Sequence, residues 1–128
     1  MENLTNWQSW RKFAYKMLRE IARGDIIKID YVQGTIEEGL ISREEAVNFI
    51  KKGLEKFVRE RDITRKIERV IDWLEKILPY KKLCKFLNYR IRPLLPYYGF
   101  PEEQYQQARE ALKAIKEGKS IYFRGHTI

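Results

Sequence analysis

The chain has 128 residues, with 26 Lys or Arg against 18 Asp or Glu, which gives a formal net charge of +8 at pH 7. A chain of this length fits one domain that buries roughly two thirds of its unfolded surface. The single cysteine, Cys84, excludes an intramolecular disulfide. No stretch approaches the ~18 apolar residues of a membrane span, and the N-terminal residues lack a secretory pattern. We therefore expect one soluble, untargeted domain over residues 1–128.

The first predicted element is an amphipathic helix over residues 6–23. Apolar residues recur there at steps of three and four, Thr5 or Asn6 can cap the start, and Gly24 can stop the helix. We expect its buried side to consist of Trp7, Trp10, Phe13, Ala14, Met17, Leu18, Ile21 and Ala22. A basic stripe over residues 1–24 is expected to include Arg11, Lys12, Lys16, Arg19 and Arg23.

The next segment, residues 25–40, is ambiguous. Its side chains are typical of a strand, but no partner strand is evident, so we expect a short helix capped by Asp25. Ser42 and Glu45 then form a capping box, which predicts a helix over residues 43–61.

Two further helices are predicted before Pro93. The first begins at Asp62 or Thr64 and ends at Pro79, because a proline cannot continue a helix. The second covers residues 80–92. The apolar positions of the first are Ile63, Ile67, Val70, Ile71, Leu74, Ile77 and Leu78, and those of the second are Tyr80, Leu83, Cys84, Leu87 and Ile91.

The remaining chain predicts a loop, a helix and a tail. Prolines and a glycine place residues 94–100 in a loop. A last helix should run from Pro101, which suits a first turn, to Gly118. Residues 119–128 are expected to form a short extended arm docked on its own bundle or on a neighbour. The predicted fold is therefore all-α, a compact bundle of about five helices with an extended C-terminal arm.

The most informative stretch is residues 79–100, which contain five cations and six aromatic residues but no Asp or Glu. Cations attract phosphate, exposed rings stack on bases, and no carboxylate cancels the field, so the composition favours a polyanion partner. On a helical wheel of residues 80–92, the outward side carries Lys81, Lys82, Lys85, Tyr89 and Arg92, with Phe86 and Arg90 at its edges.

Two alternatives stay open for this stretch. The rings of Phe86 and Tyr89 can instead pack against residues 97–100, which would leave only the lysines for solvent. The abundance of Lys, Arg and Glu is also typical of thermostable proteins, whatever they bind.

Catalysis has little support in the sequence. His126 is the only histidine and has no Cys, His or carboxylate at ligand spacing, so neither a zinc site nor a His-based acid–base pair is expected. Cys84 lies among apolar positions and is expected to be a small core residue. The sequence predicts no enzyme, no metal site and no cofactor.

We expect a non-catalytic structural protein that coats or packages nucleic acid, double-stranded DNA above others, through phosphate contacts. The alternative is a helical adaptor or regulator that binds an acidic protein through the same basic aromatic surface. The candidate nucleic-acid-binding residues are Arg11, Lys12, Lys16, Arg19, Arg23, Lys81, Lys82, Lys85, Tyr89, Arg90 and Arg92.

The small size, the helical pattern, the basic aromatic blocks at residues 7–23 and 80–92, and the Lys/Glu/Ile-rich composition resemble the coat nucleoproteins of filamentous archaeal viruses. The likeness is one of type across the whole chain, without a diagnostic motif. It implies helical subunits that pack along double-stranded DNA as repeating dimers, a homo-oligomer or a sister subunit as partner, no cofactor and no catalysis. The location implied is a virion or the cytoplasm. This chain lacks the long basic N-terminal arm of that family.

Overall fold

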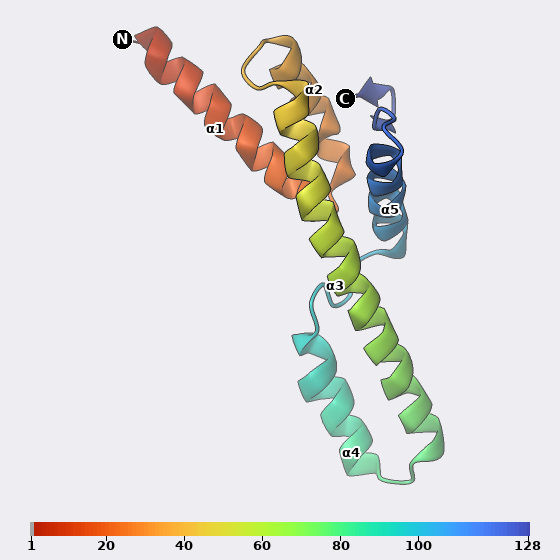
Figure 1. Ribbon diagram of the computed structural model, residues 1–128. Helices are drawn as coiled ribbons and strands as arrows, with labels where there is room; N and C mark the ends of the chain where they lie inside the picture. The colour runs from red at the N-terminus through yellow and green to blue at the C-terminus, as the bar shows by residue number, and fades with distance from the viewer. Residues whose placement is uncertain (1) are drawn as a thin grey trace. The chain divides into compact units, whose positions relative to one another are not determined.

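The computed structural model describes residues 2–128, with side chains from Gln8 onward, so the predicted buried position of Trp7 lies outside the described side chains. The described chain has five α-helices and a two-stranded hairpin near its C-terminus (Figure 1). The predicted helical fold class is confirmed. The chain divides into two compact units: unit 1 comprises residues 1–57 and 101–128, and unit 2 comprises residues 58–100. A single domain over residues 1–128 stays a prediction.

Unit 1 begins with α1 (Glu2–Ala22), a short 3-10 helix η1 (Ile26–Lys28) and α2 (Ile29–Glu37). α1 ends before Gly24, whose φ of 97° belongs to the left-handed region that glycine adopts freely. The ambiguous residues 25–40 are thus helical, as expected. Asp25 does precede η1, but its side chain makes no capping hydrogen bond, so that part of the prediction is wrong.

The longest element, α3, spans Arg43–Ile77. Its start is the predicted one, because the Glu45 amide donates to Ser42 Oγ over 3.0 Å. The predicted break between Arg61 and Thr64 is wrong. Neither glycine nor proline occurs from residue 54 to residue 78, so nothing interrupts the backbone hydrogen bonds there. Residues up to 57 of α3 belong to unit 1 and the others to unit 2.

The core of unit 1 forms where α1, α2 and the first part of α3 pack together. The helices come close at Gly53, where an added Cβ would lie 2.2 Å from Ala22 Cβ. Trp10, predicted to be buried, is instead exposed. The largest fully buried side chains of the unit are Leu18, Ile21, Ile29, Val32, Ile50, Leu54, Phe57 and Tyr105.

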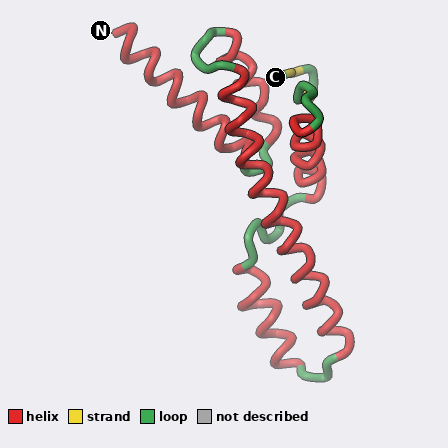
Figure 2. Tube along the Cα trace, viewed as in Figure 1, coloured by secondary structure: helices red, strands yellow, loops and turns green. Residues whose placement is uncertain are grey.

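The C-terminal part of unit 1 consists of α5 (Glu102–Lys116) and strands β1 (Tyr122–Phe123) and β2 (His126–Thr127). The two strands, yellow near the C-terminus in Figure 2, pair antiparallel, so the expected short extended arm takes the form of a small hairpin. The hairpin docks on its own unit. Its flanking residues Ile121 and Ile128 are buried, and His126 Nδ1 lies 2.9 Å from Gln33 Oε1, within hydrogen-bonding distance.

Unit 2 pairs the second part of α3 with a returning helical segment. That segment comprises α4 (Lys81–Phe86), a π-helical turn η2 (Leu87–Ile91) and a 3-10 turn η3 (Arg92–Leu94). It was predicted to end before Pro93, but the 3-10 turn continues through Pro93 to Leu94. No helix in the described part of the chain is long and apolar enough to cross a membrane.

Two side chains of α3 hold the loop that follows η3. Thr64 Oγ1 donates to the Pro96 carbonyl over 2.6 Å. Arg61, only 7% exposed, donates to the carbonyls of Tyr97 and Phe100 over 3.2 and 3.4 Å. Tyr97 has a φ of 56°, an uncommon conformation for a tyrosine. These hydrogen bonds fix the loop on α3 despite that local cost.

Candidate nucleic-acid interface

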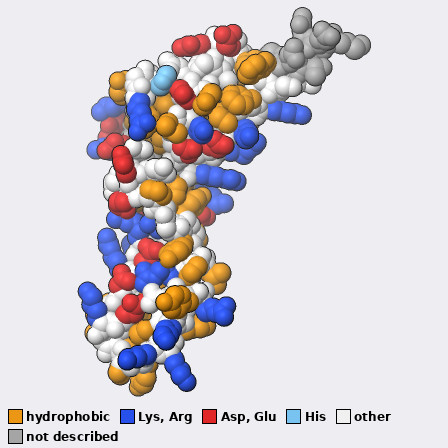
Figure 3. Space-filling model, turned by 180° about the vertical axis from the view of Figure 1, so that it is seen from behind, with side chains coloured by type: hydrophobic (Ala, Val, Ile, Leu, Met, Phe, Trp, Pro, Cys, Tyr) orange, Lys and Arg blue, Asp and Glu red, His pale blue; other side chains and the backbone are white. Residues whose placement is uncertain are grey.

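The segment formed by α4 and η2 presents two adjoining rows of cationic and aromatic side chains to solvent. Residues four apart lie one above the other on a helix, so Lys81, Lys85 and Tyr89 form one row, and Lys82, Phe86 and Arg90 form the next. All six side chains are exposed. We call these six residues the basic rows. Figure 3 shows Lys and Arg side chains standing among hydrophobic ones over this part of the surface.

The aromatic members of the basic rows are available for contact. Tyr89 is 75% exposed and Phe86 is 51% exposed. Both exposed fractions are far above that of an aromatic ring packed into a core. The alternative in which these rings are buried against residues 97–100 is therefore not what the structure shows. In that loop, Tyr97 packs edge-on against Phe100 instead.

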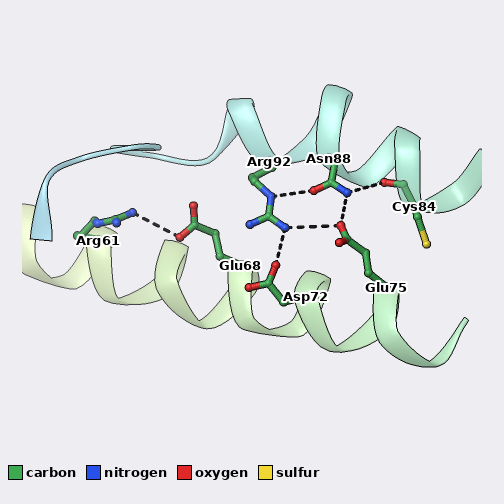
Figure 4. Close-up of polar contacts among 7 residues, drawn as sticks. All are labelled: Arg61, Glu68, Asp72, Glu75, Cys84, Asn88 and Arg92. Carbon is green, nitrogen blue, oxygen red and sulfur yellow. Dashed lines mark hydrogen bonds and ion pairs between the residues drawn. The ribbon is translucent and has the colours of Figure 1, made fainter. Parts of the chain in front are cut away.

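Arg92 differs from the other candidates, because its guanidinium is engaged inside the helical hairpin of unit 2 (Figure 4). Its Nη2 donates to Asp72 Oδ1 over 2.8 Å and lies 3.7 Å from Glu75 Oε1, while its Nε donates to Asn88 Oδ1 over 3.1 Å. The hydrogen bond to Asp72, opposed by partial burial, raises the pKa of Arg92 above its ordinary value. The side chain is 17% exposed.

Asn88 completes this polar contact between the two helices. Its Nδ2 donates to the Cys84 carbonyl over 3.1 Å and also to Glu75. Asn88 and Arg92 therefore face the carboxylates of α3, and Cys84 precedes them by one turn on the same row. The predicted outward position of Arg92 is wrong.

The π-helical turn explains why the wheel misplaced Arg92. Hydrogen bonds in a π turn span five residues instead of four, so the turn takes in about one extra residue. One residue corresponds to about 100° on an α-helix. Arg92 therefore lies at roughly the angle that residue 91 would have in an uninterrupted helix, which is on the side that was expected to face inward.

A second cationic surface lies on α1 in unit 1. Lys12, Lys16, Arg19 and Arg23 are exposed as expected. Arg11 differs, because its Nη2 donates to Glu45 Oε1 over 3.3 Å. An open groove of about 500 Å³ follows this helix, and its described lining is Gln8, Arg11, Lys12, Tyr15 and Arg19.

Two exposed cations of α3, Arg69 and Lys76, were not among the predicted site residues. On the helical wheel they lie to one side of the contact with α4, and the row of Lys81, Lys85 and Tyr89 turns to the same side of the antiparallel pair. The sequence shows both cations, but they belong to an alternation of Glu and Arg that is typical of a solvated helix surface. Unit 2 as a whole has eleven Lys or Arg against five Asp or Glu, a net charge of +6.

The described residues contain no group of three or more His, Cys, Asp or Glu side chains placed to hold a metal ion. Comparisons with protein-family models, with curated proteins and with solved structures found no match.

Proposed function

We propose that the protein is a non-catalytic structural protein that binds nucleic acid through phosphate contacts and coats or packages DNA. The observation that carries the proposal is the pair of basic rows, in which Lys81, Lys82, Lys85 and Arg90 stand exposed beside the rings of Phe86 and Tyr89. Cations with interleaved rings are suited to a phosphate backbone and to exposed bases.

The arrangement favours sequence-tolerant binding. Long, flexible lysine side chains on an exposed helix can reach phosphates, while direct base recognition requires polar groups held in fixed positions. Lys12, Lys16, Arg19 and Arg23 of α1 provide a second contact surface under this proposal. Double-stranded DNA is the favoured target, and the coating role requires self-association or a sister subunit, as in a virion or another nucleoprotein assembly.

The test is binding to labelled double-stranded DNA, single-stranded DNA and RNA over a series of salt concentrations. The variant Lys81→Ala/Lys82→Ala/Lys85→Ala should bind more weakly at low salt. Its plot of log affinity against log salt should also be flatter by about 2.7 on duplex DNA, since each phosphate contact contributes about 0.9.

The matched control is Lys51→Ala/Lys52→Ala/Lys116→Ala, which removes three exposed lysines of unit 1 and leaves the same net charge of +5. The control should retain the wild-type slope. If both variants flatten the slope equally, binding follows net charge alone and the basic rows are not the contact surface. If the wild-type chain binds none of the three nucleic acids at 50 mM salt, the function is wrong and an acidic protein partner becomes the better hypothesis.

The ring of Tyr89 gives a second test. Tyr89→Ala should weaken binding to single-stranded nucleic acid by roughly 5- to 150-fold, which corresponds to the loss of about 1–3 kcal/mol of stacking. Tyr89→Phe keeps the ring and should bind like the wild type. Equal losses in both variants would instead indicate a role for the hydroxyl group.

A further inference from the structure

One side of unit 2 is apolar and exposed. Along the second part of α3, Ile63, Ile67, Val70, Leu74 and Ile77 alternate at steps of four and three, the spacing of a helix seam that packs against another helix. Four of the five side chains are exposed, with Val70 at 54%, and Leu74 is half-buried. This stripe does not face the returning helical segment, because Asp72 and Glu75, which contact Arg92 and Asn88, lie on another side of α3.

The returning helix extends the same apolar face. With Asn88 and Arg92 directed at α3, the wheel places Leu83, Leu87 and Ile91 to one side of that contact. In an antiparallel pair this is the side to which the α3 stripe also turns. Leu94, 78% exposed, continues the row. The apolar face of unit 2 therefore consists of Ile63, Ile67, Val70, Leu74, Ile77, Leu83, Leu87, Ile91 and Leu94.

This face is large enough to be an interface. The exposed fractions of its six exposed members, which range from 36% to 78%, together equal about three fully exposed side chains. At roughly 150–200 Å² each, this amounts to about 500 Å². Two such faces packed together would bury about 1,000 Å², the lower limit for a specific interface. The largest apolar patch of a typical monomer is about 300–600 Å² and is often functional.

We infer that the apolar face of unit 2 packs against the same face of a second copy of this chain. Two helical hairpins joined in this way form a four-helix bundle, which buries the seam that one hairpin leaves uncovered. A two-fold arrangement needs only one self-complementary surface, which an uncharged stripe provides. The inference rests in part on the proposed function, because it names the surface for the self-association that a coating protein requires.

Charge explains how this contact fits with nucleic-acid binding. Lys81, Lys85 and Tyr89 turn to the side of the hairpin opposite the apolar face, so a bound polyanion and a second copy would not compete. Each unit 2 carries a net charge of +6, so two copies repel each other until salt or phosphate screens them. Self-association should therefore strengthen with salt, whereas nucleic-acid binding weakens with salt. Salt should therefore change self-association and nucleic-acid binding in opposite directions.

The first experiment is analytical ultracentrifugation of the full chain without nucleic acid, at 50 and at 500 mM NaCl. The wild type should shift from monomer toward dimer as salt rises. Val70→Glu places a charge in the middle of the stripe and should abolish the shift. Lys76→Gln changes the net charge by the same one unit on another side of the same helix and should dimerise at least as well as the wild type.

Cross-linking gives a second readout that does not depend on a disruptive variant. Val70 is the middle residue of the stripe, so in a two-fold pair it should lie close to the symmetry axis and to its own copy. In a Cys84→Ser background, Val70→Cys should yield a covalent dimer with a short bismaleimide at 500 mM NaCl. Lys76→Cys in the same background should not.

The inference would be overturned by a wild-type chain that stays monomeric at both salt concentrations, together with a Val70→Cys variant that forms no covalent dimer. Binding of the monomer to phosphatidylcholine/phosphatidylserine vesicles, lost in Val70→Glu, would assign the face to a lipid surface instead. Because these measurements contain no nucleic acid, their failure would leave the proposed binding function standing. A chain that dimerises but binds no nucleic acid would support this interface and contradict the proposed binding function.

Discussion

Gly53 lies where α3 comes close to α1, against Ala22. An added Cβ would lie 2.2 Å from Ala22 Cβ and 3.1 Å from its Cα, so helix axes rather than a flexible side chain would have to move. Gly53→Ala should therefore lower the free energy of unfolding by about 1–3 kcal/mol, although alanine has the better helix propensity.

Gly34 in α2 is the matched control, since nothing lies within 4 Å of an added Cβ there. Gly34→Ala should raise stability by about 0.5–1 kcal/mol. Chemical denaturation of both variants measures the contrast. Equal stabilisation by the two substitutions would show that α1 and α3 do not pack as closely as described.

Arg92 is a second residue whose role can be separated from binding. Arg92→Ala removes its hydrogen bonds to Asp72 and Asn88 and should lower stability by about 1–2 kcal/mol. It should not change the salt slope of nucleic-acid binding, because its guanidinium is already occupied. Lys85→Ala should flatten the salt slope of nucleic-acid binding and leave stability unchanged. A flatter salt slope of binding in Arg92→Ala, at unchanged stability, would show that Arg92 contacts the nucleic acid after all.

Among the structural elements, helix boundaries could be predicted from the sequence where a capping residue, a proline or a glycine determines the local backbone. Ser42 with Glu45 located the start of α3, and Pro93 and Gly118 located helix ends within a few residues. The continuous passage of α3 through Asp62 was missed, because a residue that can cap a helix can also lie within one. The π turn at Leu87–Ile91 leaves no comparable mark in the sequence, and a turn of this kind rotates the residues that follow it, Arg92 among them.

The periodicity of α3 predicted apolar positions correctly but not their burial. Ile63, Val70 and Ile77 follow the helical period and are exposed, since a pattern shows which side of a helix is apolar and not whether anything covers it. The basic rows could be predicted for the same reason. Charge and exposure usually coincide, so Lys81, Lys82, Lys85 and Arg90 are where the sequence placed them.

The loop that follows η3 should depend on its hydrogen bond to Thr64 of α3. Thr64→Val keeps the shape of a fully buried side chain but removes the 2.6 Å hydrogen bond to the Pro96 carbonyl. We expect a loss of about 1–2 kcal/mol in stability and faster hydrogen exchange at the amides of Tyr98 and Phe100. Thr127→Val, at an exposed position of β2, should leave those amides unchanged. Unaltered exchange in both variants would mean that Arg61 alone holds the loop.

On the scale of the whole molecule, charge is concentrated in one part of the chain. Unit 1 has fifteen Lys or Arg against thirteen Asp or Glu, so its net charge is +2, while the much shorter unit 2 carries +6. Such concentration is unfavourable for packing copies together through unit 2. It becomes favourable when a polyanion is present. Assembly and nucleic-acid binding should therefore be coupled through electrostatic repulsion, without any change of conformation.

This coupling makes a prediction that neither surface makes alone. Lys81→Ala/Lys82→Ala/Lys85→Ala lowers the charge of unit 2 from +6 to +3, so at 50 mM NaCl the variant should self-associate more strongly than the wild type while it binds DNA more weakly. At 500 mM NaCl, where repulsion is screened, the two chains should self-associate equally. Sedimentation equilibrium at both salt concentrations measures the difference. A variant that self-associates less than the wild type at low salt would place these lysines within the interface between copies, and the separation of an apolar face from a cationic one would be wrong.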